Sequence, residues 1–219
     1  MGHAYAFVGV SKGPLQDVSL HGDHGETVIV GGARGTGKHL ILRLLLGLEK
    51  PTSGTVRVLG KDLQCLSIVE RRLLRVPVGL VPIEGPLLSN LSMFDNVALP
   101  LRYHLGLSEA EVDARVRRAL AQMGLEQLAN RRPWQVSMPQ RRLASLARAR
   151  LMRPEILLLE DPYGGMDARD AEHISRVVRD VVSSGCAVLM TTMDQSVEAL
   201  RGGPMADLPK IRFVSRGAP

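Results

Sequence analysis

The stretch Thr27-Val28-Ile29-Val30-Gly31-Gly32-Ala33-Arg34-Gly35-Thr36-Gly37-Lys38-His39 decides the fold of this 219-residue chain. A short apolar run typical of a strand comes first, then a glycine-rich loop, then a helical pattern with leucines at 40, 44, 45 and 48. Gly32 to Lys38 matches the pattern G-x-x-x-x-G-K between a strand and a helix, and this context predicts a phosphate-binding loop. Its glycines let backbone N–H groups turn toward phosphate oxygens, and the ammonium of Lys38 neutralises the terminal phosphates.

The residue after this lysine departs from the pattern. A Ser or Thr hydroxyl at that position ligates Mg²⁺, whereas this sequence has His39. Imidazole is a poor ligand for a hard cation that prefers oxygen. We therefore expect phosphate binding to persist and the Mg²⁺ site to be doubtful, and a role of His39 toward a softer metal stays open.

Outward from this loop, short apolar runs alternate with helical patterns. Strand-like runs recur at 55–58, 156–159 and 187–190, and a helical pattern covers about 168–182. Apolar strands between helices predict an α/β fold around a mainly parallel sheet that is covered on both faces.

The middle of the chain differs because it is helical throughout. Ser108 and Glu111 form a capping-box pattern, and apolar positions follow at 112, 116, 120 and 123. We expect one domain whose core comprises residues 1–83 and 154–219, with a helical subdomain at 84–153.

Composition excludes several classes of protein. Hydrophobic residues make up 45% and charged residues 23%, so the chain is globular and not disordered. There is no run of 18 apolar residues and no secretory leader pattern, which predicts a cytoplasmic protein. Cys65 and Cys186 are expected to be reduced thiols, and Trp134 is expected to pack against the core. The histidines outside the loop show no metal-binding spacing: His3, His21, His24, His104 and His173.

The net charge of +6 is unevenly distributed. Residues 113–153 contain ten arginines against Asp113 and Glu126, a local surplus of +8. Such a block indicates a solvated helix face, an anionic membrane surface or nucleic acid. The aromatic content of 3% argues against single-stranded nucleic acid, so this partner is not expected.

Over nearly its whole length the chain resembles the nucleotide-binding subunit of an ABC transporter. The resemblance rests on residues 16–20, the phosphate loop, Pro51 to Gly54, Phe94 to Val97, Pro154 to Asp167 and the tail around Asp207. The stretch from Phe94 to Leu107 looks most like the ATPases of Mce/Mla-type lipid-trafficking systems. The resemblance implies a P-loop NTPase (RecA-like) fold, with antiparallel edge strands beside the parallel sheet and the inserted helical subdomain. It also implies ATP as the ligand.

The resemblance assigns roles to individual residues. It implies that ATP is bound by Gly32, Ala33, Arg34, Gly35, Thr36, Gly37, Lys38 and His39. Ser137 and Gln140 belong to the signature loop that clamps the partner subunit's nucleotide, and Asp167 is the D-loop aspartate. Glu160 takes the metal-side position at the end of the Walker B strand, and Asp161 takes the position of the general base.

Six departures from the family pattern affect positions that the family uses to bind the nucleotide or to hydrolyse it. The hydroxyl after Lys38 is replaced by His39, the sensing glutamine by Ile83 and the switch histidine by Met193. The signature loop reads Val136-Ser137-Met138-Pro139-Gln140, and Walker B ends in Glu160-Asp161 with its two acids exchanged. Finally, no aromatic residue near 9–14 is placed to stack on adenine. A displacement of about 1 Å in a catalytic group can cost on the order of 100-fold in rate.

From this resemblance we expect a degenerate ATPase that hydrolyses ATP weakly or not at all. It would form a homodimer or heterodimer, lie on the inner face of the cell membrane, and dock on a permease through residues 84–101. The expected cargo is a lipid or another organic solute. Two alternatives stay open: an active transport ATPase with an atypical site, and a soluble nucleotide-sensing or nucleic-acid-associated member of the family.

Overall fold

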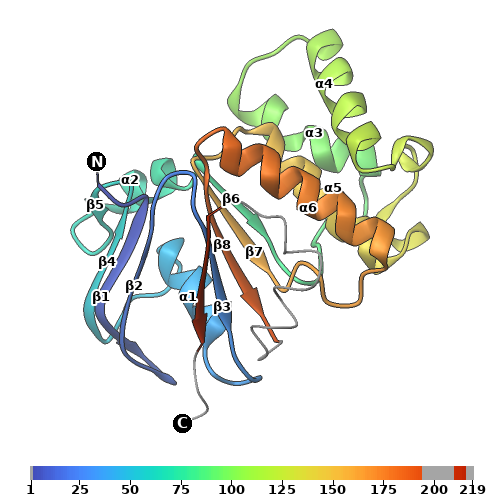
Figure 1. The fold of residues 1–219 in the computed structure, drawn as a ribbon. Coiled ribbons are helices and arrows are strands. Elements are labelled where there is room, and N and C mark those ends of the chain that lie inside the picture. Colours follow the sequence, from blue (N-terminus) through green and yellow to red (C-terminus); the bar gives the residue numbers. More distant parts are fainter. Residues whose placement is uncertain (1, 194–209, 216–219) are drawn as a thin grey trace.

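The computed structural model describes residues 2–193 and 210–215, and its strands form two sheets (Figure 1). An antiparallel sheet has the order β2-β1-β4-β5 and a parallel sheet has the order β6-β7-β8-β3-β9. The strands are β1 (Tyr5–Lys12), β2 (Leu15–Gly22), β3 (Thr27–Gly31), β4 (Ser53–Val58), β5 (Lys61–Asp62), β6 (Val78–Val81), β7 (Ile156–Glu160), β8 (Ala187–Thr192) and β9 (Ile211–Ser215). The helices are α1 (Lys38–Leu45), α2 (Ile68–Leu74), α3 (Met93–His104), α4 (Glu109–Gln122), α5 (Met138–Leu151) and α6 (Ala168–Ser183), with 3₁₀ turns at Glu126–Leu128 and Pro133–Gln135.

The parallel sheet is the middle layer of the molecule. Successive side chains of a strand point to opposite faces, so each buried strand serves two cores. On β7, Ile156 and Leu158 pack with α1 and the antiparallel sheet, while Leu157 and Leu159 pack with the helices of the other side. This arrangement explains the uninterrupted apolar runs of the central strands.

The segment between β6 and β7 is helical, as the sequence pattern predicts. It contains α3, α4 and α5, which lie together at one end of the molecule (Figure 1). Buried side chains of α4, among them Val112, Val116 and Leu120, join the core that also receives α6 and one face of the parallel sheet. The subdomain boundaries at 83/84 and 153/154 stay a prediction.

The α/β class is confirmed, and the antiparallel strands form a sheet of their own. The predicted pattern at 168–182 corresponds to α6, and the run at 187–190 lies within β8. The tail around Asp207 lies outside the described residues. Trp134 was expected to pack in the core, which is wrong: its side chain is 68% exposed on the turn before α5.

Candidate nucleotide-binding site

The carboxyl ends of the parallel strands bring the expected site residues to one edge of the sheet. The phosphate loop follows β3, the segment with Ile83 follows β6, Glu160 ends β7, and Met193 follows β8. Ligands of open α/β sheets bind at this edge. Four segments far apart in the sequence therefore meet around one loop.

The phosphate loop is shaped by its glycines. Gly37 adopts a left-handed conformation, with φ 83° and ψ 14°, directly before α1. A Cβ there would lie 2.7 Å from Leu15 Cδ2, so glycine is required by conformation and by space. No side chain caps the start of α1. The first N–H groups of the helix, together with its dipole, are thus left for an anion.

Lys38 lies inside this loop. Its ammonium donates to the carbonyl of Gly32, to that of Ala33 at 2.6 Å and to Thr36 Oγ1 at 3.4 Å. Burial lowers the pKa of Lys38, and the nearby Asp161 carboxylate opposes this shift. The loop thus holds a partly desolvated cation beside the uncapped start of α1, as a phosphate-binding site requires.

Glu160 lies between the strand end and the loop after β6. Its Oε2 accepts a hydrogen bond from the backbone N–H of Ile83 at 3.3 Å. His39, Ile83, Glu84 and Glu160 all line a cavity of about 440 Å³, whose remaining wall is mostly apolar. The expected metal-side acid and two of the altered positions therefore share one space beside the phosphate loop.

Asp161 occupies a constrained turn. Its φ is 43°, its side chain is buried, and its N–H donates to the Thr191 carbonyl at 2.9 Å. A methyl group at Gly164 would lie 2.2 Å from Asp161 Oδ2, so the carboxylate fills the space that this glycine leaves open. The expected base is thus held by packing within the turn 161–164.

Met193 contacts the phosphate loop directly. Its Sδ accepts a hydrogen bond from Arg34 Nε at 3.4 Å. A thioether is only a weak acceptor and has no proton to donate. The position expected for the switch histidine is therefore beside the loop but without a group that can exchange protons.

Ser137, Gln140 and Asp167 begin helices. Ser137 Oγ accepts from the Gln140 N–H at 3.3 Å, and Gln140 Oε1 accepts from the Ser137 N–H at 2.9 Å, which is a capping box. Pro139 lies in the first turn of α5, where a missing N–H costs no intrahelical bond. Asp167 caps α6 by accepting from the Asp170 N–H at 2.8 Å. None of the contacts described for this chain joins these three residues to its own phosphate loop.

Arg142 is a site residue that the sequence analysis did not single out. It is 3% exposed on α5 and donates to the carbonyls of Ile83 at 2.8 Å and Gly164 at 2.7 Å. The carbonyls of Asp161 and Pro162 accept from it at 3.2 Å each. Burial lowers the pKa of this guanidinium, and Asp161 opposes the shift. Arg142 thus ties the helical segment to both loops that carry the acids.

The residues at this edge fit a phosphate group. The uncapped helix start, the positive-φ glycines and Lys38 supply donors and positive charge. They do not supply the hydroxyl and carboxamide oxygens that the resemblance implies for Mg²⁺. Within the described part of the chain, no three His, Cys, Asp or Glu side chains bring their ligand atoms together here.

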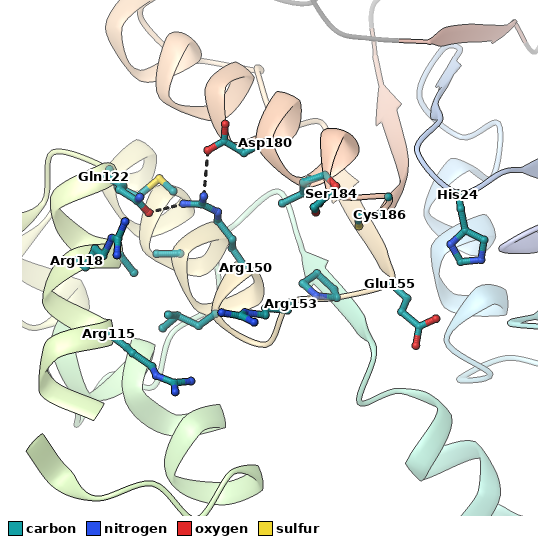
Figure 2. A pocket seen from close by; sticks show the side chains of 17 residues that line it. His24, Arg115, Arg118, Gln122, Arg150, Arg153, Glu155, Asp180, Ser184 and Cys186 are labelled. Carbon is teal, nitrogen blue, oxygen red and sulfur yellow. Dashed lines mark hydrogen bonds and ion pairs between the residues drawn. The ribbon is translucent and has the colours of Figure 1, made fainter. Parts of the chain in front are cut away.

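A larger groove of about 920 Å³ lies where α4, α5 and α6 meet the start of β7 (Figure 2). Arg115 and Arg118 on α4 and Arg153 after α5 line it, with Glu155 and His24 at its far side. Arg150 lines the groove as well, together with its partners Gln122 and Asp180 (Figure 2). This and further arginines of the basic block have partners within the chain. Arg150 donates to Gln122 and, at 3.0 Å, to Asp180; Arg117 pairs with Asp113; Arg148 donates to the Pro86 carbonyl; and Arg142 is buried. The block therefore serves several local contacts, most of them structural.

Comparisons with known proteins agree with this geometry. A family model described as ABC transporter matches residues 15–164. The cell division ATP-binding protein FtsE of Escherichia coli K12 is 33% identical over 194 residues, covering 89% of this chain and 87% of FtsE. The macrolide export ATP-binding/permease protein MacB of Burkholderia thailandensis is 36% identical over 84% of this chain. That match is only 28% of MacB, so this chain spans less than a third of its length.

Solved structures show the same fold. A dimeric structure of MJ0796, a bacterial ABC transporter cassette, superposes with a TM-score of 0.85 at 27% identity, covering 96% of this chain and 94% of that one. A post-hydrolysis dimer of MJ0796 bound to ADP and Pi gives a TM-score of 0.83 at 28% identity, covering 91% of each chain. None of the helices in the described ranges is long and apolar enough to cross a membrane.

Proposed function

This chain belongs to the ABC transporter family of ATP-binding proteins, and from that premise we propose that it binds ATP but hydrolyses it weakly or not at all. The observation that carries the proposal is the arrangement around Lys38. The phosphate loop keeps its glycines and its lysine, while His39, Ile83 and Met193 surround it in place of a hydroxyl, a carboxamide and an imidazole.

The chain's own residues account for binding. N–H groups at the start of α1 and the ammonium of Lys38 hold the phosphates, and Arg142 positions the loops that flank them. Mg²⁺ would supply charge neutralisation at the phosphates when bound. Hydrolysis also needs a positioned water and base. Asp161 is one methylene shorter than the expected glutamate and is packed against Gly164, which supports slow or absent turnover.

The two-subunit arrangement of the family strengthens this argument. Each site of such a dimer uses one subunit's phosphate loop and the other's signature loop. This chain has altered residues at both, including Met138 and Pro139. A homodimer would have two impaired sites, and a heterodimer would have both of its sites impaired as well. We propose that the chain holds or regulates a complex more than it drives one.

We further propose that a membrane permease is the partner and that residues 84–101 receive it. The cavity beside Ile83 supports this assignment, because Leu48, Leu80, Pro82 and Pro86 give it an apolar wall that a short partner helix can fill. Leu88, at the start of the segment, is 52% exposed. The names of FtsE and MacB refer to cell division and macrolide export, whereas the stretch from Phe94 to Leu107 favours lipid or organic-solute trafficking. The protein would then lie on the cytoplasmic face of the membrane.

An active ATPase with an atypical site is the second candidate. It is favoured by one observation, namely that Lys38, Glu160 and Asp161 all lie at the same edge of the sheet. A nucleic-acid-associated role is less favoured, because several arginines of the basic block hold carbonyls or acids of the chain itself.

Calorimetric titration with ATP, with and without Mg²⁺, tests the proposal. We expect micromolar binding that changes less than about tenfold on adding Mg²⁺ and that is lost in Lys38→Ala. Lys61→Ala is the matched control, since it removes an exposed lysine on β5 at the edge of the antiparallel sheet. Binding that depends strongly on Mg²⁺, or that survives Lys38→Ala, would contradict the proposal.

A further inference from the structure

The fold brings together three side chains at the amino-terminal end of the chain. His3 Nδ1 lies 2.5 Å from Asp23 Oδ1, and the rings of His3 and His21 are 4.1 Å apart, centroid to centroid. One ligand atom from each of the three residues lies within 4.8 Å of the others. Among the described residues this is the one such group of His, Cys, Asp and Glu.

This cluster cannot be recognised from the spacing of its residues in the sequence. It forms because β1 and β2 pair in an antiparallel register. β1 and β2 pair Tyr5 with Gly22 and Ala6 with His21. The N–H of Ala4 extends this pairing by donating to the Gly22 carbonyl at 2.9 Å. The segment that carries His3 is thereby held beside the turn that carries Asp23. The sequence spacing of His3 and His21 carries no metal-binding pattern, and only the strand register brings them close to Asp23.

The turn that carries Asp23 is also fixed from its other side. Glu26 accepts from the Asp23 N–H at 2.9 Å and from Arg212 on β9 at 2.7 Å. Arg212 in addition donates to the His21 carbonyl. Hydrogen bonds therefore fix the backbone that carries two of the proposed ligands, His21 and Asp23.

The carboxylate of Asp23 accepts a hydrogen bond from the imidazole of His3. The hydrogen bond from His3 is the main cause that lowers the pKa of Asp23, and the charges of His3, His21 and Arg212 add to it. The cluster is also open to solvent, since the side chains of His3 and Asp23 are 49% and 57% exposed. A hydrated ion can reach all three groups from outside.

We propose that His3, His21 and Asp23 form a binding site for a divalent transition-metal ion of the Zn²⁺ type. Two imidazoles and one carboxylate are a common protein donor set for such ions, whereas Mg²⁺ prefers oxygen donors alone. At bond lengths of about 2.1 Å, tetrahedral donors lie roughly 3.4 Å apart, so small side-chain rotations suffice to close the cluster. Water completes the coordination.

The site is separate from the phosphate loop. It precedes β3, whereas the phosphate loop follows β3, and five residues of strand span roughly 16 Å. A bound ion would link the segment before β1 to the turn between β2 and β3. We therefore assign it a structural role, in which the metal stabilises the attachment of the amino-terminal hairpin to the parallel sheet.

Calorimetric titration of the nucleotide-free protein with Zn²⁺ tests the site, in a Cys65→Ser background because Cys65 is an exposed thiol. We expect one ion per chain with micromolar or tighter affinity. His3→Ala, His21→Ala and Asp23→Asn should each weaken binding by at least about tenfold. His24→Ala is the matched control, since it removes the neighbouring exposed histidine and should leave the affinity unchanged.

Two further measurements distinguish a specific metal site from adventitious binding of Zn²⁺. Zn²⁺ at about 100 times its Kd should raise the melting temperature by several degrees in the parent and in His24→Ala, but not in His3→Ala. Co²⁺ should give the intense visible absorption of a tetrahedral complex, which Asp23→Asn should lose. Unchanged Zn²⁺ affinity in the three ligand variants, or no saturable binding, would overturn the assignment. Lys38→Ala should bind Zn²⁺ normally, so failure of the ATP-binding proposal would be seen separately.

Discussion

At the scale of residues, we propose that a few single functional groups set this site apart from the family pattern. The exchange at Glu160 and Asp161 keeps two carboxylates but moves each by one methylene. His39 and Ile83 remove oxygen donors without disturbing the fold, because they line an open cavity. These positions could be recognised from the sequence because each follows a strand with an unmistakable motif.

Arg142 could not be recognised in this way. It is one of ten arginines in a basic stretch, and nothing in the local pattern distinguishes a buried guanidinium from a solvated one. Its partners are backbone carbonyls 19 to 59 residues away in the chain, so its role depends on the packed structure. The contact between His3 and Asp23 could not be recognised from the sequence either, because it depends on the register in which β1 and β2 pair.

Replacing Arg142 with alanine should therefore be costly. The change leaves up to four carbonyls without their donor in a buried place, and we expect a loss of about 3 kcal/mol in the free energy of unfolding. Urea unfolding followed by circular dichroism measures it. Arg117→Ala is the control, because its exposed pair with Asp113 should contribute less than about 0.5 kcal/mol. Equal losses in the two variants would show that Arg142 is not the link we describe.

At the scale of elements, the start of α4 was predicted and the first strands were not. The capping box at Ser108 and Glu111 starts α4 as the pattern indicates. The same pattern at Ser137 and Gln140 starts α5, although the family resemblance had drawn attention to nucleotide contacts there. The strands β1 and β2 were not predicted as a hairpin, because β1 contains Gly9 and their pairing is interrupted by register shifts.

Ser137 allows the helix cap to be separated from the signature role. Ser137→Ala and Ser108→Ala remove the same cap from α5 and α4, and each should lower the free energy of unfolding by about 1 kcal/mol. Only Ser137→Ala should weaken dimerisation driven by ATP, as measured by analytical ultracentrifugation. If both variants dimerise like the parent, Ser137 serves only as a cap.

The junction of α3 and α4 should respond to acid. Ser92 donates to the Asp95 carboxylate at 2.6 Å and Arg102 donates to it at 3.0 Å, and these contacts lower the pKa of Asp95. Because the pKa is lower in the folded state, the stabilisation is complete above about pH 4 and is lost as the pH falls through the folded value.

Asp95→Asn should accordingly be less stable than the parent at neutral pH, by less than about 1 kcal/mol since the side chain is partly exposed. The difference should shrink as the pH falls below about 4. Thermal unfolding of both proteins across this range tests it. A difference that is constant with pH would exclude a charged Asp95 as the cause.

At the scale of the whole molecule, the parallel sheet explains why the fold was predictable. Its strands are apolar on both faces because two cores meet there, and this gives a strong and simple sequence signal. The antiparallel sheet has one buried face and an irregular β1, so its signal is weak. Four segments, at the carboxyl ends of β3, β6, β7 and β8, meet near Lys38. Their arrangement depends on tertiary contacts such as those of Arg142, which the sequence pattern does not reveal.

For the molecule as a whole, we propose that the cassette keeps its phosphate loop and its architecture while its catalytic positions are altered. Its basic stretch is compatible with this view, because much of it braces α4, α5 and α6 internally. Binding and hydrolysis are therefore expected to be uncoupled in this chain, with binding intact.

Phosphate release from ATP and Mg²⁺ tests this claim most directly, measured on the purified chain beside Lys38→Ala. We predict that the unmodified chain releases phosphate at the background rate of Lys38→Ala or only slightly faster. A variant restoring the family residues (His39→Ser, Ile83→Gln, Met138→Gly, Pro139→Gly, Glu160→Asp, Asp161→Glu and Met193→His) should release it at least about 100-fold faster. Turnover by the unmodified chain as fast as that of the restored variant, and lost in Lys38→Ala, would contradict weak hydrolysis and establish an active ATPase.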